Sequence, residues 1–247
     1  MSGLYVETLV TKYGRSHIGE VFTTNEGYSA EVIDGGTKMN YCSIKILDWT
    51  GEAHYDSIKR GKFKYPYHLS VLDVACIGEG KYKRGSHVKM YRTWLGMLTR
   101  VYDESQRHKH PTYKDVSVHK DWLNFQTFGK WFEENYINGW DIDKDLLSGE
   151  SKIYGPDTCV FIPPSLNNFM TNVKSDNTSG RVGVSWHKRD CVWQANIRID
   201  NKLKYLGSFN DLEKASDTYK KYRKEQAKRF QLEYQNILPL EVILNIK

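Results

Sequence analysis

The sequence predicts a mixed α+β protein built from three small modules. Three observations lead to this prediction. Short β-type runs broken by glycines fill the first third of the chain, two helical aromatic patterns fill the middle, and three further strand-like runs precede a helix near the C-terminus. The 247 residues suffice for two or three domains of about 100 residues each.

The first module is predicted at residues 1–80. Three β-type runs occur in it, at residues 19–24, 28–33 and 42–47. Asp34-Gly35-Gly36 lies between the last two runs and is a hairpin signal. Short strands joined by tight turns are expected of small antiparallel sheets, and we predict a compact SH3-like β-barrel here. The Gly- and Lys-rich stretch 78–85 predicts a linker.

The second module is predicted at residues 86–168 and begins with two amphipathic helices. Apolar side chains recur every three or four residues from Val88 to Tyr102 and again from Trp122 to Tyr136. The aromatic stripe of the second pattern is typical of a core face. Beyond it, Gly139–Asp145 and the apolar run Cys159–Pro164 predict two strands with a loop between them.

The third module is predicted at residues 179–247, after an Asn-, Ser- and Thr-rich tether at 167–180. It contains three strand-like runs separated by turn residues, at 183–187, 192–198 and 204–209. The helix that follows begins at Asn210 or Asp211, both of which are N-cap residue types. A three-stranded sheet packed on one helix has its other face uncovered.

Positive charge is concentrated in this last module. The whole chain has a formal net charge of +6 and a pI near 8.9. Residues 179–231 hold 13 Lys and Arg against 6 Asp and Glu, an excess of seven positive charges. Such a segment suits a polyanionic partner, although a solvated protein surface has the same composition.

Cysteine usage and hydropathy exclude several classes of protein. The four cysteines include no C-x-x-C pair, which argues against a zinc knuckle and a disulfide framework, and we expect buried thiols in a reducing compartment. No apolar run approaches the roughly 20 residues of a membrane span, and the N-terminus has no apolar signal core. The expectation is therefore no membrane partner and a cytoplasmic location.

A set of residues in the third module has a family-specific identity and spacing. Its members are Gly183, Val184, Trp186, Trp193, Ala195, Ile197, Leu206, Gly207, Ser208, Phe209, Glu213, Ala215 and Tyr219. This set resembles the AP2 domain, a DNA-binding module of plant transcription factors and of phage and mobile-element nucleases. The resemblance implies a sheet lying in the major groove of double-stranded DNA. The contact residues it implies are Trp186, Lys188, Arg189, Trp193, Arg198 and Lys204.

Strand alternation divides the middle strand of that sheet into two faces. The two sets are Trp193, Ala195 and Ile197 on one side and Gln194, Asn196 and Arg198 on the other. Only one set can face the helix, and the sequence leaves open which one, so Trp193 is either a DNA contact or a core residue. Lys and Arg would attract phosphates, and Arg, Asn or Gln would read bases.

The second module carries a family pattern as well. It consists of Tyr91, Trp94, Met97, Arg100, Tyr102, Tyr113, Trp122, Phe125, Phe128, Trp131, Asp143-Lys144-Asp145 and Tyr154-Gly-Pro-Asp-Thr-Cys159. These residues resemble a domain common in phage proteins of the HNH endonuclease type. The resemblance implies a ββα fold in which a strand ends in Asp-His or His-His. The first residue of that pair binds a divalent metal, and the second is the general base.

The chain departs from the HNH pattern at this pair. Asp143 and Lys144 stand at the two positions, so the general-base histidine is absent. A lysine is a poor base unless burial lowers its pKa by several units. The central asparagine of the family is also replaced, with Glu150 or Ser151 where it would be expected.

A metal site is nevertheless predicted at this segment. Asp143 and Asp145 alternate with Lys144, so on a strand both carboxylates point to one side, and Asp141 extends the same face. Carboxylate oxygens are the ligands that Mg²⁺ prefers. Asp143, Lys144 and Asp145 are therefore the candidate catalytic residues, and the two aspartates are the candidate ligands of Mg²⁺ or another divalent metal. The alternative is that acidic turn residues simply flank a helix end.

Three functional hypotheses follow. In the first, a phage or mobile-element protein uses an AP2-like reader to bring an HNH-like, metal-dependent endonuclease to double-stranded DNA. In the second, a degenerate nuclease scaffold serves a non-catalytic DNA-binding or regulatory protein. In the third, the chain is a phage inhibitor that blocks a host enzyme, with the N-terminal module contacting the host protein. A phage-encoded chain would act in the host cell cytoplasm.

Overall fold

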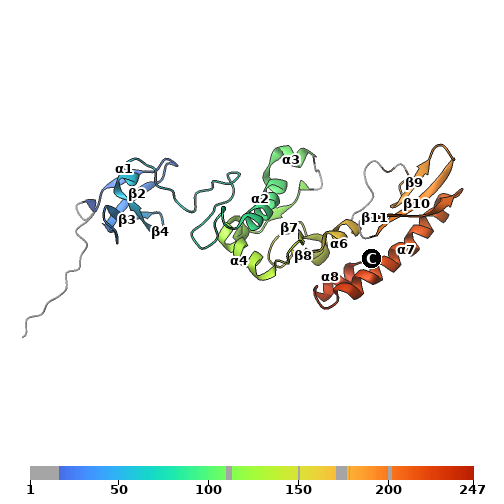
Figure 1. Cartoon of the computed structure of the whole chain (residues 1–247). Coiled ribbons are helices and arrows are strands. Elements are labelled where there is room, and N and C mark those ends of the chain that lie inside the picture. The colour runs from blue at the N-terminus through green and yellow to red at the C-terminus, as the bar shows by residue number, and fades with distance from the viewer. Residues whose placement is uncertain (1–16, 110–112, 150, 171–176, 178, 200–201) are drawn as a thin grey trace, which may run out of the picture. The chain divides into compact units, whose positions relative to one another are not determined.

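The structure is a computed structural model that describes residues 17–109, 113–149, 151–170, 177, 179–199 and 202–247. It is a mixed α+β protein with several small sheets, as the sequence predicts. The chain divides into two compact units, Met1–Lys81 and Tyr82–Lys247 (Figure 1).

The first unit is an antiparallel meander with the strand order β1-β2-β3-β4. Its strands are β1 (Val21–Thr23), β2 (Ser29–Gly35), β3 (Tyr41–Ile46) and β4 (Trp49–His54), followed by helix α1 (Tyr55–Lys59). Ala30, Val32, Cys42, Ile44 and Ile46 are buried at alternate positions, so one face of the sheet forms the core. The three predicted strands and the hairpin between β2 and β3 are confirmed.

Within the described residues β1 pairs with β2 and β4 pairs with β3, and no pairing joins β1 to β4. Closure of the sheet into a barrel therefore stays a prediction. Residues 78–85, predicted as a linker, form hydrogen bonds with both units. Trp49 Nε1 donates to Glu79 Oε2 (2.7 Å), while the buried Tyr82 donates from its amide to Gln126 Oε1 (3.0 Å) and from its hydroxyl to Glu133 Oε2 (2.7 Å).

The second unit begins with the two predicted helices. The first is α2 (Val88–Tyr102), as the apolar periodicity indicates. The second is α4 (Phe125–Asn135), which follows a 3-10 turn, η3 (Lys120–Leu123), because Asn124 caps the helix by accepting from the amide of Gln126 (2.9 Å). Trp94 is fully buried between them and donates to the carbonyl of Trp122 (2.7 Å).

Short strands and helices complete the middle of this unit. They are α3 (Glu104–Lys109), β5 (Ser117–Val118), β6 (Asp141–Asp143), α5 (Asp145–Ser148), β7 (Ile153–Tyr154), β8 (Val160–Ile162) and α6 (Pro164–Phe169). β6 and β8 form an antiparallel pair, and β5 and β7 form a parallel pair. Strands are thus confirmed within 139–145 and 159–164, but the first ends at Asp143, and the segment predicted as a loop between them contains α5 and β7.

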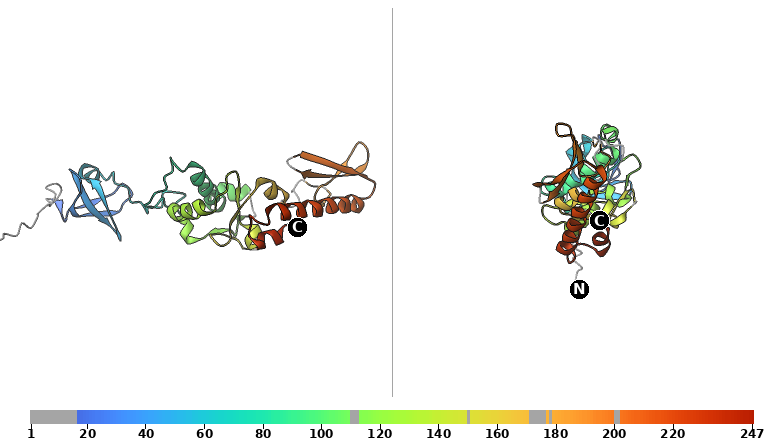
Figure 2. Two further views of the ribbon diagram at one scale, coloured as in Figure 1. Left: turned by 60° about the horizontal axis from the view of Figure 1, so that its bottom comes forward. Right: turned by 90° about the vertical axis from the view of Figure 1, so that its right-hand side faces the viewer.

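The C-terminal region is a three-stranded antiparallel sheet in the order β11-β10-β9 with a long helix against it (Figure 2). Its elements are β9 (Val184–His187), β10 (Val192–Ile199), β11 (Lys202–Phe209) and α7 (Leu212–Tyr234). Asp211 is the N-cap of α7 and accepts from the amide of Lys214 (2.8 Å). All four elements match the predictions.

The second half of α7 and helix α8 (Leu240–Asn245) pack on the middle of the unit. The rings of Phe169 and Phe230 lie 5.2 Å apart, and Asn245 Nδ2 donates to the carbonyl of Leu146 (2.8 Å). A continuous core therefore connects the C-terminal region to β8, α5 and α6. The predicted tether is shorter than expected, because Asn167 and Asn168 belong to α6; positions 171–176 and 178 lie outside the described residues.

Candidate nucleic-acid interface

The two faces of the C-terminal sheet have different surroundings. Ala195 and Ile197 are buried and pack with Ala215 and Tyr219 of α7, and Trp193 lies against the same cluster. This resolves the alternative that the sequence leaves open, because Trp193 lies on the helix side of the sheet. Gln194, Asn196 and Arg198 consequently lie on the opposite side, which α7 does not cover.

Cross-strand register identifies the neighbours of this polar row. Ser208 pairs with Gln194, Tyr205 with Asn196, and Leu203 with Arg198. A register shift between Ala195 and Asn196 skips Leu206 on β11 and keeps Tyr205 and Leu203 on the open side. Tyr205 is 57% exposed and Leu203 is 67% exposed. We call the surface formed by Gln194, Asn196, Arg198, Leu203, Tyr205 and Ser208 the open face.

The residues that the AP2 resemblance implies as contacts are divided between three places. Arg198 lies on the open face, and Lys188 and Arg189 are exposed in the turn between β9 and β10. Trp186 pairs in register with Trp193, and their rings lie 4.8 Å apart on the helix side.

Lys204 lies on the helix side as well, with its Nζ 4.8 Å from the centre of the Tyr222 ring. The structure thus brings Trp186 and Trp193 together but separates Arg198 from Lys204. The sequence-based prediction did not include Leu203 and Tyr205 in this surface. They alternate with Lys204 along β11, so the strand pattern could have placed them on the face opposite Lys204.

The segment Asp143–Asp145 is built differently from its prediction. β6 ends at Asp143, and Asp145 is the first residue of α5. Strand alternation therefore does not extend to Asp145, and the premise that both carboxylates share one face of a strand is wrong. Instead, Asp143 Oδ1 accepts the first two amides of α5, from Asp145 (2.9 Å) and Leu146 (2.8 Å), while Lys144 pairs with Asp145.

Burial raises the pKa of Asp143 above its ordinary value. Desolvation raises the pKa of its carboxyl, the nearby Asp145 raises it further, and the two amide hydrogen bonds and Lys144 only partly oppose this. Burial also raises the pKa of the neighbouring Cys159 thiol to about 12, so this thiol stays protonated at neutral pH. Within the described part of the chain, no group of three or more His, Cys, Asp or Glu side chains has a geometry that could hold a metal ion.

No protein-family model, curated protein or solved structure matches this chain. The resemblances to the AP2 and HNH families therefore depend on the sequence motifs alone. None of the helices in the described ranges combines the length and the apolar character that crossing a membrane requires.

Proposed function

We propose that this chain binds double-stranded DNA through the open face of the β9-β10-β11 sheet. The observation that carries the proposal is the row Gln194, Asn196 and Arg198, which lies on the side of the sheet opposite the α7 core. These are the residue types that read base edges, because Arg matches guanine and Asn or Gln matches adenine with paired hydrogen bonds.

The surroundings of the row support the same proposal. The major groove is about 12 Å wide and admits a two-stranded β-ribbon, and the paired strands β10 and β11 carry the residues of the open face. The exposed Leu203 and Tyr205 stand beside the polar row and offer apolar contact to thymine methyl groups. Arg189 in the β9–β10 turn pairs with Asp190 (2.9 Å), and together with Lys188 the turn has a net positive charge at one end of the sheet, where the phosphate backbone would pass.

The finer architecture is part of the proposal. The C-terminal sheet and helix correspond to the AP2-like module, and the first unit corresponds to the SH3-like one. In the middle, the antiparallel pair β6 and β8 is followed directly by α6, which is the ββα order of the HNH-like module.

Binding is tested with the full chain by fluorescence anisotropy of a labelled duplex at several salt concentrations. If about five phosphates are neutralised, the logarithm of the affinity falls with the logarithm of salt at a slope of about −4 to −5. Arg198→Ala removes a charge from the open face and should flatten that slope by about 1.

Lys204→Ala is the matched control, because it removes the same charge from the helix side of the adjacent strand. Its slope should stay close to the wild-type slope. An equal effect of both substitutions would place the contact surface elsewhere, and absence of binding at low salt would refute the proposal altogether.

A second candidate function is metal-dependent DNA cleavage by the HNH-like module. It is favoured by the ββα order and by the desolvated Asp143 at the end of β6, since perturbed carboxyl groups concentrate at catalytic sites. Supercoiled plasmid is incubated with Mg²⁺ or Mn²⁺ and with the wild type, Asp143→Ala or Asp143→Asn. Cleavage by the wild type and by neither variant supports the role of Asp143. Equal cleavage by all three removes Asp143 from the mechanism, and cleavage by none favours a binding protein.

A further inference from the structure

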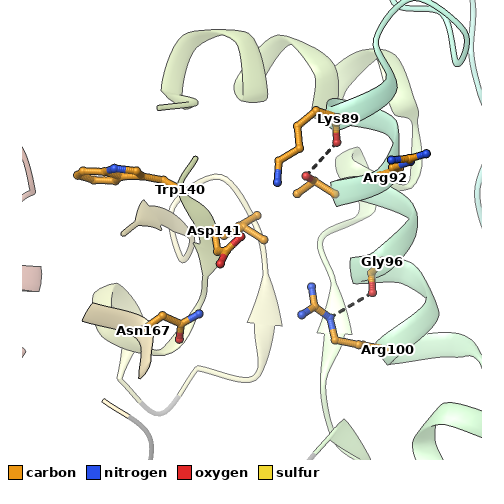
Figure 3. Close-up of a pocket in the computed structure, with 9 residues that line it drawn as sticks. Lys89, Arg92, Gly96, Arg100, Trp140, Asp141 and Asn167 are labelled. Atoms are coloured by element: carbon orange, nitrogen blue, oxygen red, sulfur yellow. Dashed lines mark hydrogen bonds between the residues drawn. The ribbon is translucent and has the colours of Figure 1, made fainter. Parts of the chain in front are cut away.

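A basic pocket of about 630 Å³ lies in the second unit, and Asp143 is not among its lining residues (Figure 3). It is lined by Lys89, Arg92, Thr93, Gly96, Arg100, Trp140, Asp141, Ile142 and Asn167. One wall is the face of α2 on which Lys89, Thr93, Gly96 and Arg100 recur every three or four residues. A Cβ on Gly96 would meet no atom within 4 Å, so the glycine leaves this wall open.

The charged groups of the pocket stand on opposite walls. Lys89 and Arg100 project from α2 toward the wall that carries Asp141 and Asn167, whereas Arg92 points away from it (Figure 3). The Nε of Arg100 donates to the carbonyl of Gly96 (3.1 Å), which fixes its guanidinium on this wall. Among the described residues no ion pair joins Lys89 or Arg100 to Asp141, so the space between the walls is not closed by the protein's own charges.

We propose that this pocket binds one phosphodiester group of the DNA backbone. Lys89 and Arg100 supply N–H donors of the kind that bind phosphate oxygens, and the side-chain amide of Asn167 lies on the facing wall. Three cations, Lys89, Arg92 and Arg100, and one carboxylate, Asp141, line the pocket, so its lining has a net charge of +2. This positive charge attracts the negatively charged phosphodiester, while Asp141 opposes the second charge of a terminal phosphate. The inference rests on the proposed DNA binding and adds a second contact to it.

The position of the pocket suits a second contact on the same duplex. The first half of helix α7 packs on the sheet. Tyr234, at the end of α7, contacts Trp140 of the pocket wall, with the centres of the two rings 5.7 Å apart. A helix of 23 residues is about 35 Å long, which is close to the length of ten base pairs of DNA. We therefore expect the pocket to be engaged by duplexes longer than about one helical turn.

The test compares Lys89→Ala with Lys130→Ala in the full chain. Both lysines are exposed, and Lys130 lies on α4 outside the pocket, so the two variants lose the same charge from different places. On a 24-base-pair duplex, Lys89→Ala should lower the affinity several-fold at low salt and flatten the salt slope by about 1. Lys130→Ala should match the wild type, and so should Lys89→Ala on an 8-base-pair duplex. Arg100 is left intact because its contacts with Gly96 and Tyr154 make it part of the fold.

Asp141→Asn tests the charge argument in the opposite direction. Loss of the carboxylate should raise the affinity for the long duplex and should make inorganic phosphate a stronger competitor than it is for the wild type.

The pocket proposal is overturned if the wild type binds the duplex, Arg198→Ala weakens binding, and Lys89→Ala behaves as Lys130→Ala. The reverse result, with Lys89→Ala weakened and Arg198→Ala unchanged, would retain the pocket and reject the open face. A wild type that binds no duplex would reject both.

Discussion

Alternation along a strand was applied both to β10, which carries part of the open face, and to the Asp143–Asp145 segment, and the structure agrees with it only on β10. On β10 the alternation holds over eight residues, so Ala195 and Ile197 enter the core and Asn196 and Arg198 face outward. At Asp143 the strand has only three residues and ends where the candidate site was expected to continue. The same rule succeeded in one region and failed in the other.

The difference lies in what the backbone needs at each place. Inside a strand, neighbouring strands satisfy the amide and carbonyl groups, and side chains are left for other contacts. At a helix start the first amides have no partner within the helix, and a preceding carboxylate is a ready acceptor. Asp143 fills that role for α5, which uses one of the oxygens that a metal site would require.

The sharpest test of the open face places the same charge on two adjacent residues of β10. Ile197 is 3% exposed, and Ile197→Asp would bury an unpaired carboxylate in the core shared with α7. We expect a loss of about 3–5 kcal/mol in the free energy of unfolding. Arg198 is exposed, so Arg198→Asp should lower that free energy much less than Ile197→Asp does, while abolishing DNA binding. Urea unfolding followed by circular dichroism measures the first effect, and anisotropy measures the second.

The two substitutions control one another, because they differ by one position and by the face of the sheet. If Ile197→Asp proved as stable as the wild type and Arg198→Asp unfolded, the two faces would be assigned the wrong way round. If both variants folded and both bound DNA, the open face would have no role in binding.

Much of the fold could be predicted from local patterns. The periodicity of α2, the N-cap at Asp211 and the three C-terminal strands each depend on neighbouring residues alone. The shared core could not be predicted in this way. Phe230 and Val242 contact β8 and α6 across a long sequence separation, and nothing in their local pattern identifies those partners.

The basic pocket escaped prediction for the same reason. In the sequence, Arg92 and Arg100 are explained by a solvated helix face, and Lys89 and Arg100 acquire a facing wall only when β6 and α6 pack beside α2. Asp141 was noted only as an extension of the Asp143 face. Its place opposite α2 follows from the pairing of β6 with β8, which sets the direction of a short strand through residues about twenty positions away.

A smaller effect is expected at Asp143, where two substitutions separate a structural role from a chemical one. Asp143→Ala removes the acceptor for the two amides of α5 and should cost about 1 kcal/mol in the free energy of unfolding. Asp143→Asn retains a side-chain oxygen and loses the charge that burial disfavours, so its stability should equal or exceed that of the wild type at neutral pH. Thermal or urea unfolding of the three proteins provides the comparison.

The difference in the free energy of unfolding between the wild type and Asp143→Asn should change with pH in a defined direction. Because burial raises the pKa of Asp143 above its ordinary value of 3.8, the ionised form disfavours folding. The wild type should therefore lose stability relative to Asp143→Asn as the pH rises through the raised pKa, and the two should converge at lower pH. A wild type that instead gained on the Asn variant with rising pH would show that the two amide hydrogen bonds and Lys144 outweigh desolvation, so that the pKa of Asp143 is lowered.

The smallest effect is expected from chemical labelling of two native cysteines, one in the C-terminal sheet and one beside Asp143. Cys191 is exposed in the turn between β9 and β10, whereas Cys159 is buried near Asp143 and has a pKa raised to about 12. Thiol reactivity requires exposure and ionisation. Iodoacetamide should therefore alkylate Cys191 in the native protein and reach Cys159 only after unfolding, with rates measured by mass spectrometry of the peptides.

Saturating duplex should slow alkylation at Cys191, because Lys188 and Arg189 in the same turn are expected to lie against the phosphates. An unchanged rate at Cys191 in a protein that binds the duplex would remove this turn from the interface. Fast native alkylation of Cys159 would mean that the core beside Asp143 is open to solvent, which would undermine the desolvation on which its raised pKa depends.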